Sequence, residues 1–359
     1  MSCYYVGLDV HQASICIAVL NADGKLVMES VVETSAATIL DFLKALRGHV
    51  EVTFEEGTHA TWLYDVLKRT KAKVIVCDPR KNRLLHEGNK SDEVDARKMA
   101  QLLRAGLLSP VYHGEHGVRD LKELVRSYEY LVEDSTRVMN RIKAIFRGRA
   151  IACAGADVYK PRQREEWLER LPEPGVRARA ARLYCELDHL TGLRREARQE
   201  MLAESRRHEA CKILRQVPTL GTVRIAQLIS AVSTPHRFRS KRQFWSYCGL
   251  AVRTRSSADH HFVGGDLRRS AKATTRGLTQ DHNRTLKYVF KGAALTASRC
   301  EPFKSHDAEL LGRGLRPELA RVTVARKIAA VTLAVWKKGE AFDADKLIKH
   351  ASSADSTVG

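Results

Sequence analysis

The sequence predicts an α/β domain over residues 1–115, followed by a longer and mostly helical remainder. Three observations lead to this division. Short apolar runs rich in β-formers alternate with helix-length segments before residue 115, a heptad-spaced apolar stripe follows, and the net positive charge lies wholly in the later part. With 359 residues, of which 44% are hydrophobic, the chain can bury more than one core, which excludes global disorder.

Residues 1–115 begin with three expected strands and continue as alternating helices and strands. Tyr4–Asp9 and Ala13–Leu20 are apolar runs separated by a few residues, so we expect a hairpin, and the turn signal Asn-Ala-Asp-Gly at 21–24 follows it. The later elements are a strand over 26–32, a helix over 35–46 with Ser35 as its N-cap, a strand over 50–54, a helix over 60–70, a strand over 74–78 and a helix over 91–107. Antiparallel strands first and βαβα afterwards is the order of a ribonuclease H-like sheet.

Residues 116–210 are expected to form a linker of two long helices. A second helix is predicted over 176–210, where Pro172–Gly175 fixes its start. Two such helices make an antiparallel coiled coil, within the chain or between chains, and an ordinary helical hairpin is an equal alternative. The first helix carries apolar positions at alternating steps of three and four, as in an a/d seam: Leu121, Leu124, Tyr128, Leu131, Ser135, Val138, Ile142 and Ile145.

Residues 211–345 are expected to form a mostly α C-terminal domain. Its opening, Val217-Pro-Thr-Leu-Gly221 before a helix over 222–232, is typical of a helix-hairpin-helix, in which the turn directs backbone amides at a DNA phosphate. A Pro-x-x-Gly turn before a helix also occurs in many other folds. The small, polar tail over 346–359 is expected to be disordered.

The charge of the chain favours a nucleic acid as its partner. The first 114 residues hold 14 basic and 14 acidic side chains, so the formal net charge of +19 lies in the rest. Basic side chains there would neutralise phosphates, whereas a cationic solvated surface is the plain alternative. The positions we single out as nucleic-acid contacts are Lys90, Arg141, Arg147, Gly221, Arg268, Arg269, Lys272 and Arg276.

Other features argue against a membrane or secreted protein. The longest apolar run, Ile328–Trp336, is too short to span a bilayer, and the N-terminus lacks the basic region of a secretory signal. The eight cysteines are scattered without a C-x-x-C pair, which argues for reduced thiols and against structural zinc. We therefore expect a cytoplasmic protein.

Carboxylates stand at the ends of predicted elements. Asp9 ends the first strand, and Glu55 and Glu56 end the fourth. Asp92 and Asp95 lie three residues apart on one face of a predicted helix, although acids at a helix start also have an ordinary role in balancing its dipole. Strands one and four are neighbours in a ribonuclease H-like sheet, so the acids should converge. Such a group repels itself unless divalent cations neutralise it, and its oxygen ligands suit Mg²⁺, or Mn²⁺ as the alternative.

Three motifs then stand in order along the chain: Gly7-Leu-Asp-Val10, Phe54-Glu-Glu-Gly-Thr58 and Asn89-Lys-Ser-Asp-Glu-Val-Asp-Ala-Arg97. They resemble the motifs of the DEDD-type insertion-sequence transposases, a family that includes the pilin-gene invertases and the bridge-RNA-guided recombinases. Downstream, Leu214–Gly221 is similar to the opening of the family's second domain, and Phe244–Leu250 is similar to its Gly-Leu segment. The resemblance runs from about residue 4 to residue 335.

The resemblance implies a set of catalytic residues. Its Mg²⁺ ligands fall on Asp9, Glu55, Asp92 and Asp95, with Glu56 as the alternative to Glu55 because the local motif departs from the family's pattern. It also implies a serine that attacks the DNA phosphate and forms a covalent phosphoserine. The family's serine falls within Arg255-Ser-Ser-Ala258, where counting from Gly249-Leu250 favours Ser257 over Ser256.

The resemblance also implies partners and a setting. These are donor and target DNA, a guide (bridge) RNA encoded by the element, a bacterial or archaeal nucleoid, and a homo-oligomer, as a dimer of dimers, in which one chain's serine completes another's acidic site. We therefore predict a transposase or recombinase that cuts and rejoins DNA. The alternatives are a Holliday-junction-type metal-dependent endonuclease that uses the acids alone, and a non-catalytic basic protein that binds nucleic acid.

Overall fold

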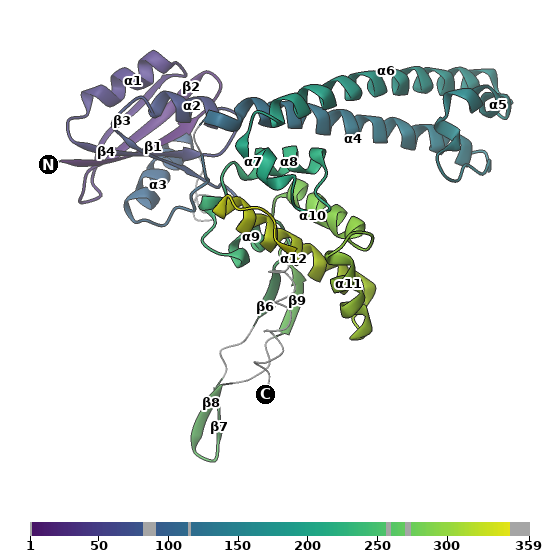
Figure 1. Ribbon diagram of the computed structural model, residues 1–359. Coiled ribbons are helices and arrows are strands. Elements are labelled where there is room, and N and C mark those ends of the chain that lie inside the picture. The colour runs from purple at the N-terminus through teal and green to yellow at the C-terminus, as the bar shows by residue number, and fades with distance from the viewer. Residues whose placement is uncertain (1, 82–90, 114–115, 256–259, 270–273, 345–359) are drawn as a thin grey trace. The chain divides into compact units, whose positions relative to one another are not determined.

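The computed structural model describes residues 2–81, 91–113, 116–255, 260–269 and 274–344 (Figure 1). The chain divides into two compact units, Met1–Glu115 and His116–Gly359. Within the described ranges, no helix combines the length and the apolar character that a membrane crossing requires. The predicted disordered tail over 346–359 lies outside the described residues.

The first unit is built on a five-stranded mixed sheet with the order β3-β2-β1-β4-β5. The first three strands pair antiparallel, whereas β4 lies parallel to β1 and β5 lies parallel to β4. This order confirms the predicted ribonuclease H-like sheet. The elements are β1 (Cys3–Val10), β2 (Ser14–Leu20), β3 (Leu26–Glu33), α1 (Ala36–Ala45), β4 (His49–Glu55), α2 (Ala60–Leu67), β5 (Lys73–Cys77) and α3 (Asp92–Arg104).

The two faces of this sheet carry different helices, because successive residues of a strand point to opposite sides. Val6 and Leu8 of β1 pack into a core with residues of α1 and α2. Gly7 faces α3 so closely that a Cβ at this position would lie 2.1 Å from the carbonyl oxygen of Ala96. The glycine therefore lets α3 lie directly on the sheet.

Two predicted helices of this unit end earlier than the sequence indicates. The helix expected over 60–70 ends at Leu67, whose carbonyl accepts a hydrogen bond from the Thr70 hydroxyl at 2.6 Å. The helix expected over 91–107 ends at Arg104, because Gly106 takes a positive φ of +68° and turns the chain. This is the usual way in which a glycine stops a helix.

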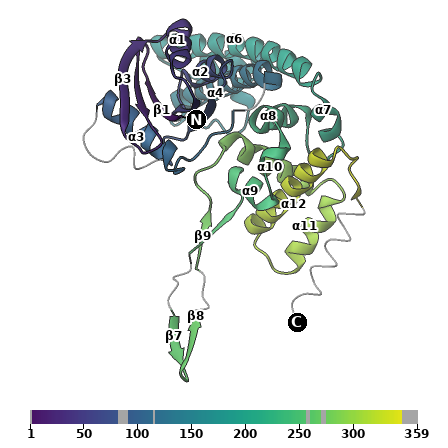
Figure 2. The ribbon, with the colours of Figure 1, turned by 90° about the vertical axis from the view of Figure 1, so that its left-hand side faces the viewer.

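The second unit begins with two long helices, α4 (Arg119–Arg147) and α6 (Pro174–Ser205), which lie side by side (Figures 1 and 2). They run antiparallel, since one core cluster joins Leu121 to Met201 and another joins Ile145 to Ala180. Most of the predicted apolar stripe of α4 faces inward, and the members that are fully buried are Leu121, Ser135, Val138, Ile142 and Ile145. That the pair forms a coiled coil remains a prediction.

The predicted continuation of the second helix to residue 210 is wrong. After α6 ends at Ser205, His208 takes an extended conformation, and a short helix α7 (Glu209–Leu214) begins behind it. The break turns Cys211 and Leu214 into the core of the second unit. Burial of these two side chains outweighs the propensity of the segment to continue one straight helix.

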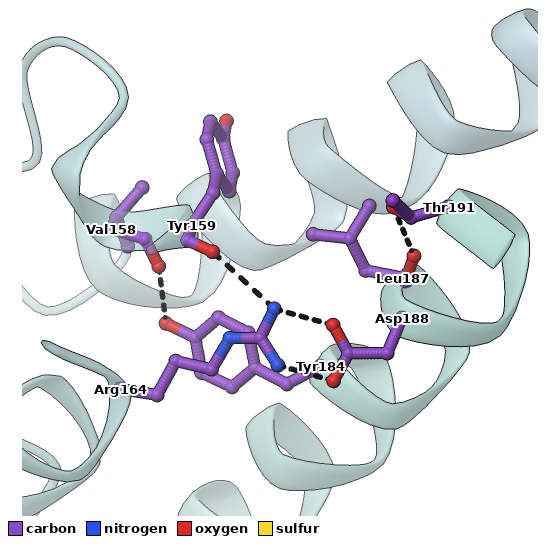
Figure 3. Close-up of polar contacts among 7 residues, drawn as sticks. All are labelled: Val158, Tyr159, Arg164, Tyr184, Leu187, Asp188 and Thr191. Atoms are coloured by element: carbon purple, nitrogen blue, oxygen red, sulfur yellow. Dashed lines mark hydrogen bonds and ion pairs between the residues drawn. The ribbon is translucent and has the colours of Figure 1, made fainter. Parts of the chain in front are cut away.

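The segment that joins α4 to α6 is closed by a small polar cluster (Figure 3). Arg164, at the start of α5 (Arg164–Glu169), makes two hydrogen bonds of 2.5 and 2.7 Å to the Asp188 carboxylate, and it also donates to the carbonyl of Tyr159. Its guanidinium carbon lies 4.9 Å from the centre of the Tyr184 ring. The Tyr184 hydroxyl donates to the carbonyl of Val158, and burial raises its pKa to about 12. One arginine therefore ties α5 to α6.

Replacing Arg164 by Ala is expected to destabilise this end of the helix pair by about 1–3 kcal/mol, because both bidentate hydrogen bonds are lost from a side chain that is only 14% exposed. The stability of Arg164→Lys should lie between that of the wild type and that of Arg164→Ala, because an ammonium cannot form the planar double contact. Urea unfolding followed by tryptophan fluorescence measures the loss, and Trp167 reports on this cluster. The control is Lys160→Ala, which breaks an exposed ion pair with Asp157 and should change stability by less than about 1 kcal/mol. If the wild type and Arg164→Ala were equally stable, Arg164 would not be what holds α5 to α6.

The rest of the second unit is mostly helical, as predicted. Its helices are α8 (Thr222–Val232), α9 (Lys241–Tyr247), α10 (Arg284–Ala297), α11 (Phe303–Gly312) and α12 (Pro317–Lys338), and they share one apolar core with the start of α4. A half-buried carboxylate in α4, Glu129, links that helix to α8 and α10 by accepting hydrogen bonds from Gln227 and Thr285. Burial raises the pKa of this carboxyl.

The sequence interpretation missed four short strands in this unit. β6 (Val252–Arg255) pairs antiparallel with β9 (Thr274–Leu278), and β7 (His260–Val263) pairs with β8 (Asp266–Arg269). Gly264 and Gly265 both take positive φ at the turn between β7 and β8, as a two-residue hairpin turn requires. These strands contain few buried apolar residues, and Phe262 is 74% exposed, so the usual alternation of buried and exposed positions is absent.

Candidate active site

The first predicted ligand, Asp9, lies near the end of β1, just before a tight turn. The His11 amide donates to the carbonyl of Ser14, which closes this turn, and the Thr34 hydroxyl donates to the carbonyl of His11. These bonds fix the backbone that carries Asp9 and His11. Both side chains therefore leave the sheet at one defined edge.

The next two predicted ligands lie in the first turns of α3. Ser91 is the N-cap of the helix, and its hydroxyl accepts a hydrogen bond from the Val94 amide at 3.3 Å. The helix therefore begins at Asp92, and Asp95 follows almost one turn later. Since Gly7 allows α3 to lie on the sheet beside β1, this N-terminus comes close to Asp9.

Asp9 and Asp92 meet at the ring of His11. The Nε2 atom of His11 lies 3.3 Å from Oδ2 of Asp9 and 3.3 Å from Oδ2 of Asp92. One ligand atom from each of these three residues lies within 4.8 Å of the others. This group includes neither Asp95 nor Glu55, so the structure brings two of the four predicted ligands together.

Asp95 stands beside this group with an oxygen that lacks a hydrogen bond. Its Oδ1 atom is buried and accepts no hydrogen bond from any residue that the structure describes. The Lys98 ammonium lies 3.8 Å from it, which is an ion-pair distance but too long for a hydrogen bond. A carboxylate oxygen of this kind can serve as a further ligand of a cation.

The strand register separates the two candidate glutamates. Leu8 pairs with Phe54 in the parallel β1–β4 ladder, so the next position in each strand puts Glu55 beside Asp9, on the face that α3 covers. Glu56 follows β4, and its carboxylate contacts Nε2 of His113. The His113 ring in turn packs on Tyr64, with the ring centres 4.9 Å apart. Glu56 therefore has a partner of its own.

The electrostatics of the group favour a bound cation. Burial raises the pKa of Asp9 above its ordinary value, and the negative charges of Asp92 and Asp95 raise it further, while His11 acts in the opposite direction. The ionised form of Asp9 is therefore disfavoured in the fold. A divalent ion would offset this cost. The carboxylates, including the Asp95 oxygen that accepts no hydrogen bond from a described residue, fit Mg²⁺ or Mn²⁺ in the chemistry of their donor atoms.

Sequence reasoning missed His11. Its signal is the spacing Asp9-x-His11 at a strand end, which puts both side chains on one side of the chain. A single histidine in a turn is ordinarily unremarkable, so the spacing alone does not select it. Contact with Asp92, 81 positions later, distinguishes this histidine from others.

The predicted nucleic-acid contacts and the serines lie in several places. Arg141 and Arg147 are exposed on α4, Gly221 is the exposed N-cap of α8, and Arg268 is exposed on β8. Arg269 and Arg276 are strand positions of β8 and β9. The remaining predicted site residues lie outside the described residues: Lys90, Ser256, Ser257 and Lys272.

Comparison with known proteins finds matches among transposases. Residues 6–149 match a family model of the DEDD type described as a transposase, and residues 211–307 match the model of the transposase IS116/IS110/IS902 family. The chain is 29% identical over 177 residues to the transposase for insertion sequence element IS1533 of Leptospira borgpetersenii. This similarity covers 46% of the chain and 50% of the relative, so the chain spans about half the length of that protein. The two family matches together take in about two thirds of the chain, which therefore belongs to the IS110 family of insertion-sequence transposases.

Proposed function

We propose that this protein cuts and rejoins DNA strands at the ends of an insertion sequence. The observation that carries the proposal is the meeting of Asp9 and Asp92 at one imidazole nitrogen, at the edge of a ribonuclease H-like sheet, in a chain of a transposase family. Such a site suits phosphoryl transfer, because its carboxylates can hold divalent cations against a phosphodiester.

The acidic residues have distinct roles in this proposal. Asp9 and Asp92 would hold a divalent cation, Glu55 stands beside Asp9 by strand register, and Asp95 adds an oxygen that accepts no hydrogen bond from a described residue. A cation bound there would stabilise negative charge on the phosphate oxygens as the strand breaks. We prefer Glu55 to Glu56 as the ligand, because the strand register puts Glu55 beside Asp9 on the face that α3 covers.

The nucleophile of the proposed reaction is Ser257, with Ser256 as the alternative. Its Oγ loses its proton and forms a bond to phosphorus while the bond from phosphorus to a deoxyribose oxygen breaks, and that oxygen takes up a proton to become a hydroxyl. The covalent link keeps the energy of the phosphodiester, so a hydroxyl of another strand can reverse the step and release the serine. Support comes from the position of both serines directly after β6, which follows the Gly249-Leu250 segment.

The proposed partners are donor and target DNA, a guide RNA encoded by the element, and further copies of the chain as a dimer of dimers. A net charge of +19 supports the nucleic acids, together with exposed arginines on α4 and β8. If an RNA-free preparation recombined a defined pair of sites, the proposal that a guide RNA is required would be wrong.

A covalent-trap experiment tests the serine chemistry. Protein co-expressed with RNA from the element's flank is incubated with labelled DNA and Mg²⁺, and the products are separated on a denaturing gel. We expect a protein–DNA adduct that persists in the control Ser256→Ala and disappears in Ser257→Ala, because only the attacking oxygen forms the link.

Other outcomes separate the alternatives. If the adduct were lost in Ser256→Ala alone, the nucleophile would be Ser256 and not Ser257. Cleaved DNA without any adduct would favour a metal-dependent endonuclease that uses the acids only. Salt-sensitive binding without Mg²⁺-dependent breakage would favour a non-catalytic nucleic-acid-binding protein.

A further inference from the structure

We propose that His11 is a nitrogen ligand of the cation held by Asp9 and Asp92, and that its imidazole makes this site prefer Mn²⁺ to Mg²⁺. The inference rests on the proposed function, because it assigns a residue to the same metal site. It also departs from a site made of carboxylates alone, which is what the sequence predicts.

The spacing of the three side chains fits neighbouring ligands of one ion. Two ligands at right angles, each about 2.1 Å from a cation, are separated by about 3 Å. The Nε2 atom of His11 lies 3.3 Å from an oxygen of Asp9 and 3.3 Å from an oxygen of Asp92. Small side-chain adjustments would therefore bring all three atoms to coordination distance without a change of the backbone.

The surroundings of His11 argue against a role in packing. Its side chain is 48% exposed, so it does not fill the core of the first unit. Its backbone is nevertheless held on both sides, by the bond from its amide to Ser14 and by the bond from the Thr34 hydroxyl to its carbonyl. A fixed backbone under a half-exposed ring that is directed at two carboxylates is what a ligand position requires.

The donor atoms determine which ion the site prefers. Mg²⁺ is a hard cation that binds oxygen and demands near-octahedral geometry. Divalent transition metals accept imidazole nitrogen as well, and Mn²⁺ is the one that carboxylates also suit. A set of two carboxylates and one imidazole should therefore hold Mn²⁺ more tightly than Mg²⁺.

An opposing explanation gives His11 only the role of a counter-charge. In that case the ring balances Asp9 and Asp92 and competes with any cation for their oxygens. Its removal would then strengthen the binding of Mg²⁺ and Mn²⁺ alike, whereas removal of a ligand weakens Mn²⁺ binding in particular. The two explanations therefore predict changes of opposite sign.

The experiment measures metal binding to the full-length protein at one fixed pH. Free Mn²⁺ is followed by electron paramagnetic resonance, and Mg²⁺ affinity is obtained by competition. We expect His11→Ala to lose about tenfold or more in Mn²⁺ affinity and less than about threefold in Mg²⁺ affinity. His11→Asn, which offers an amide oxygen, should bind Mg²⁺ like the wild type but without the preference for Mn²⁺.

Two controls keep the outcomes apart. His49→Ala removes another exposed histidine next to an acid, Glu51, and should bind both ions like the wild type. Asp92→Asn should lose both ions. If the wild type binds neither ion, the metal site and the proposed function fail together. If Asp92→Asn weakens binding while His11→Ala equals the wild type, or shifts both affinities equally, only the role of His11 is overturned.

Discussion

Replacing Asp92 by Asn is expected to lower Mg²⁺-dependent DNA cleavage by about 10²–10³-fold, with little change in DNA binding. The carboxylate contributes one of the charges that would hold a cation, and an amide supplies none. Losses of this size follow when a group that stabilises transition-state charge is removed. Asp9→Asn should behave in the same way, because Asp9 and Asp92 are equally distant from the Nε2 atom of His11.

The measurement is the single-turnover rate of strand breakage on a labelled duplex, with binding followed separately by a gel-shift titration. Asp41→Asn is the matched control, because Asp41 is an exposed acid of the first unit that pairs with Lys44 on the same helix, α1. It should cleave at the wild-type rate. If Asp92→Asn kept full activity, the Asp92 carboxylate would not take part in DNA cleavage, and the proposed role of the acidic residues would be wrong.

The same assay separates the two neighbouring glutamates. Glu55→Gln is expected to lose cleavage to a similar extent, since the strand register puts Glu55 beside Asp9. Glu56→Gln should keep most of the activity, because its carboxylate is engaged with His113. The reverse result would show that the sheet register does not determine which acid serves the site.

Loss of activity in Asp9→Asn should not reflect unfolding. Burial and the neighbouring acids raise the pKa of Asp9 in the folded protein. Its contribution to stability is therefore greatest below the pKa of the unfolded chain, and it is lost as the pH rises through the folded pKa. Asparagine carries no charge, so the metal-free variant should be at least as stable as the wild type near neutral pH.

The sequence was sufficient to predict the sheet and the approach of Asp9 to Asp92. The apolar runs of β1, β2 and β4 mark strands that are buried over several consecutive residues, and the order of the elements predicts a ribonuclease H-like arrangement. Asp9 and Asp92 could be placed because each stands at the end of an element, where the topology alone brings them together.

Other features depend on contacts between distant residues, which no local pattern encodes. His11 is distinguished only by its approach to Asp92, and Glu55 differs from Glu56 only through the pairing of β4 with β1. The break between α6 and α7 is set by the burial of Cys211 in a core that also takes in residues of α8, α10 and α12. β7 and β8 are exposed on both faces, so hydrophobic periodicity could not predict them.

Gly7→Ala is expected to destabilise the protein by about 3 kcal/mol or more. The added Cβ would lie 2.1 Å from the carbonyl oxygen of Ala96 and 2.8 Å from the amide nitrogen of Ala100. Both atoms belong to the backbone of α3, so no side-chain rotation can relieve the contact, and the helix must move off the sheet. Overpacking of this kind typically costs about 1–3 kcal/mol, and more where the obstacle is rigid.

The consequence should reach the metal site, because α3 carries Asp92 and Asp95 at its start. We expect the variant to lose Mn²⁺ binding as well as stability in urea unfolding, although the substitution changes no ligand. Gly57→Ala is the matched control, since a Cβ at Gly57 meets nothing within 4 Å. Equal stability of the two variants would mean that α3 does not lie on β1 as closely as Gly7 allows. Loss of stability with full Mn²⁺ binding would mean that the acids keep their places independently of this contact, and the helix position would then not be what assembles the site.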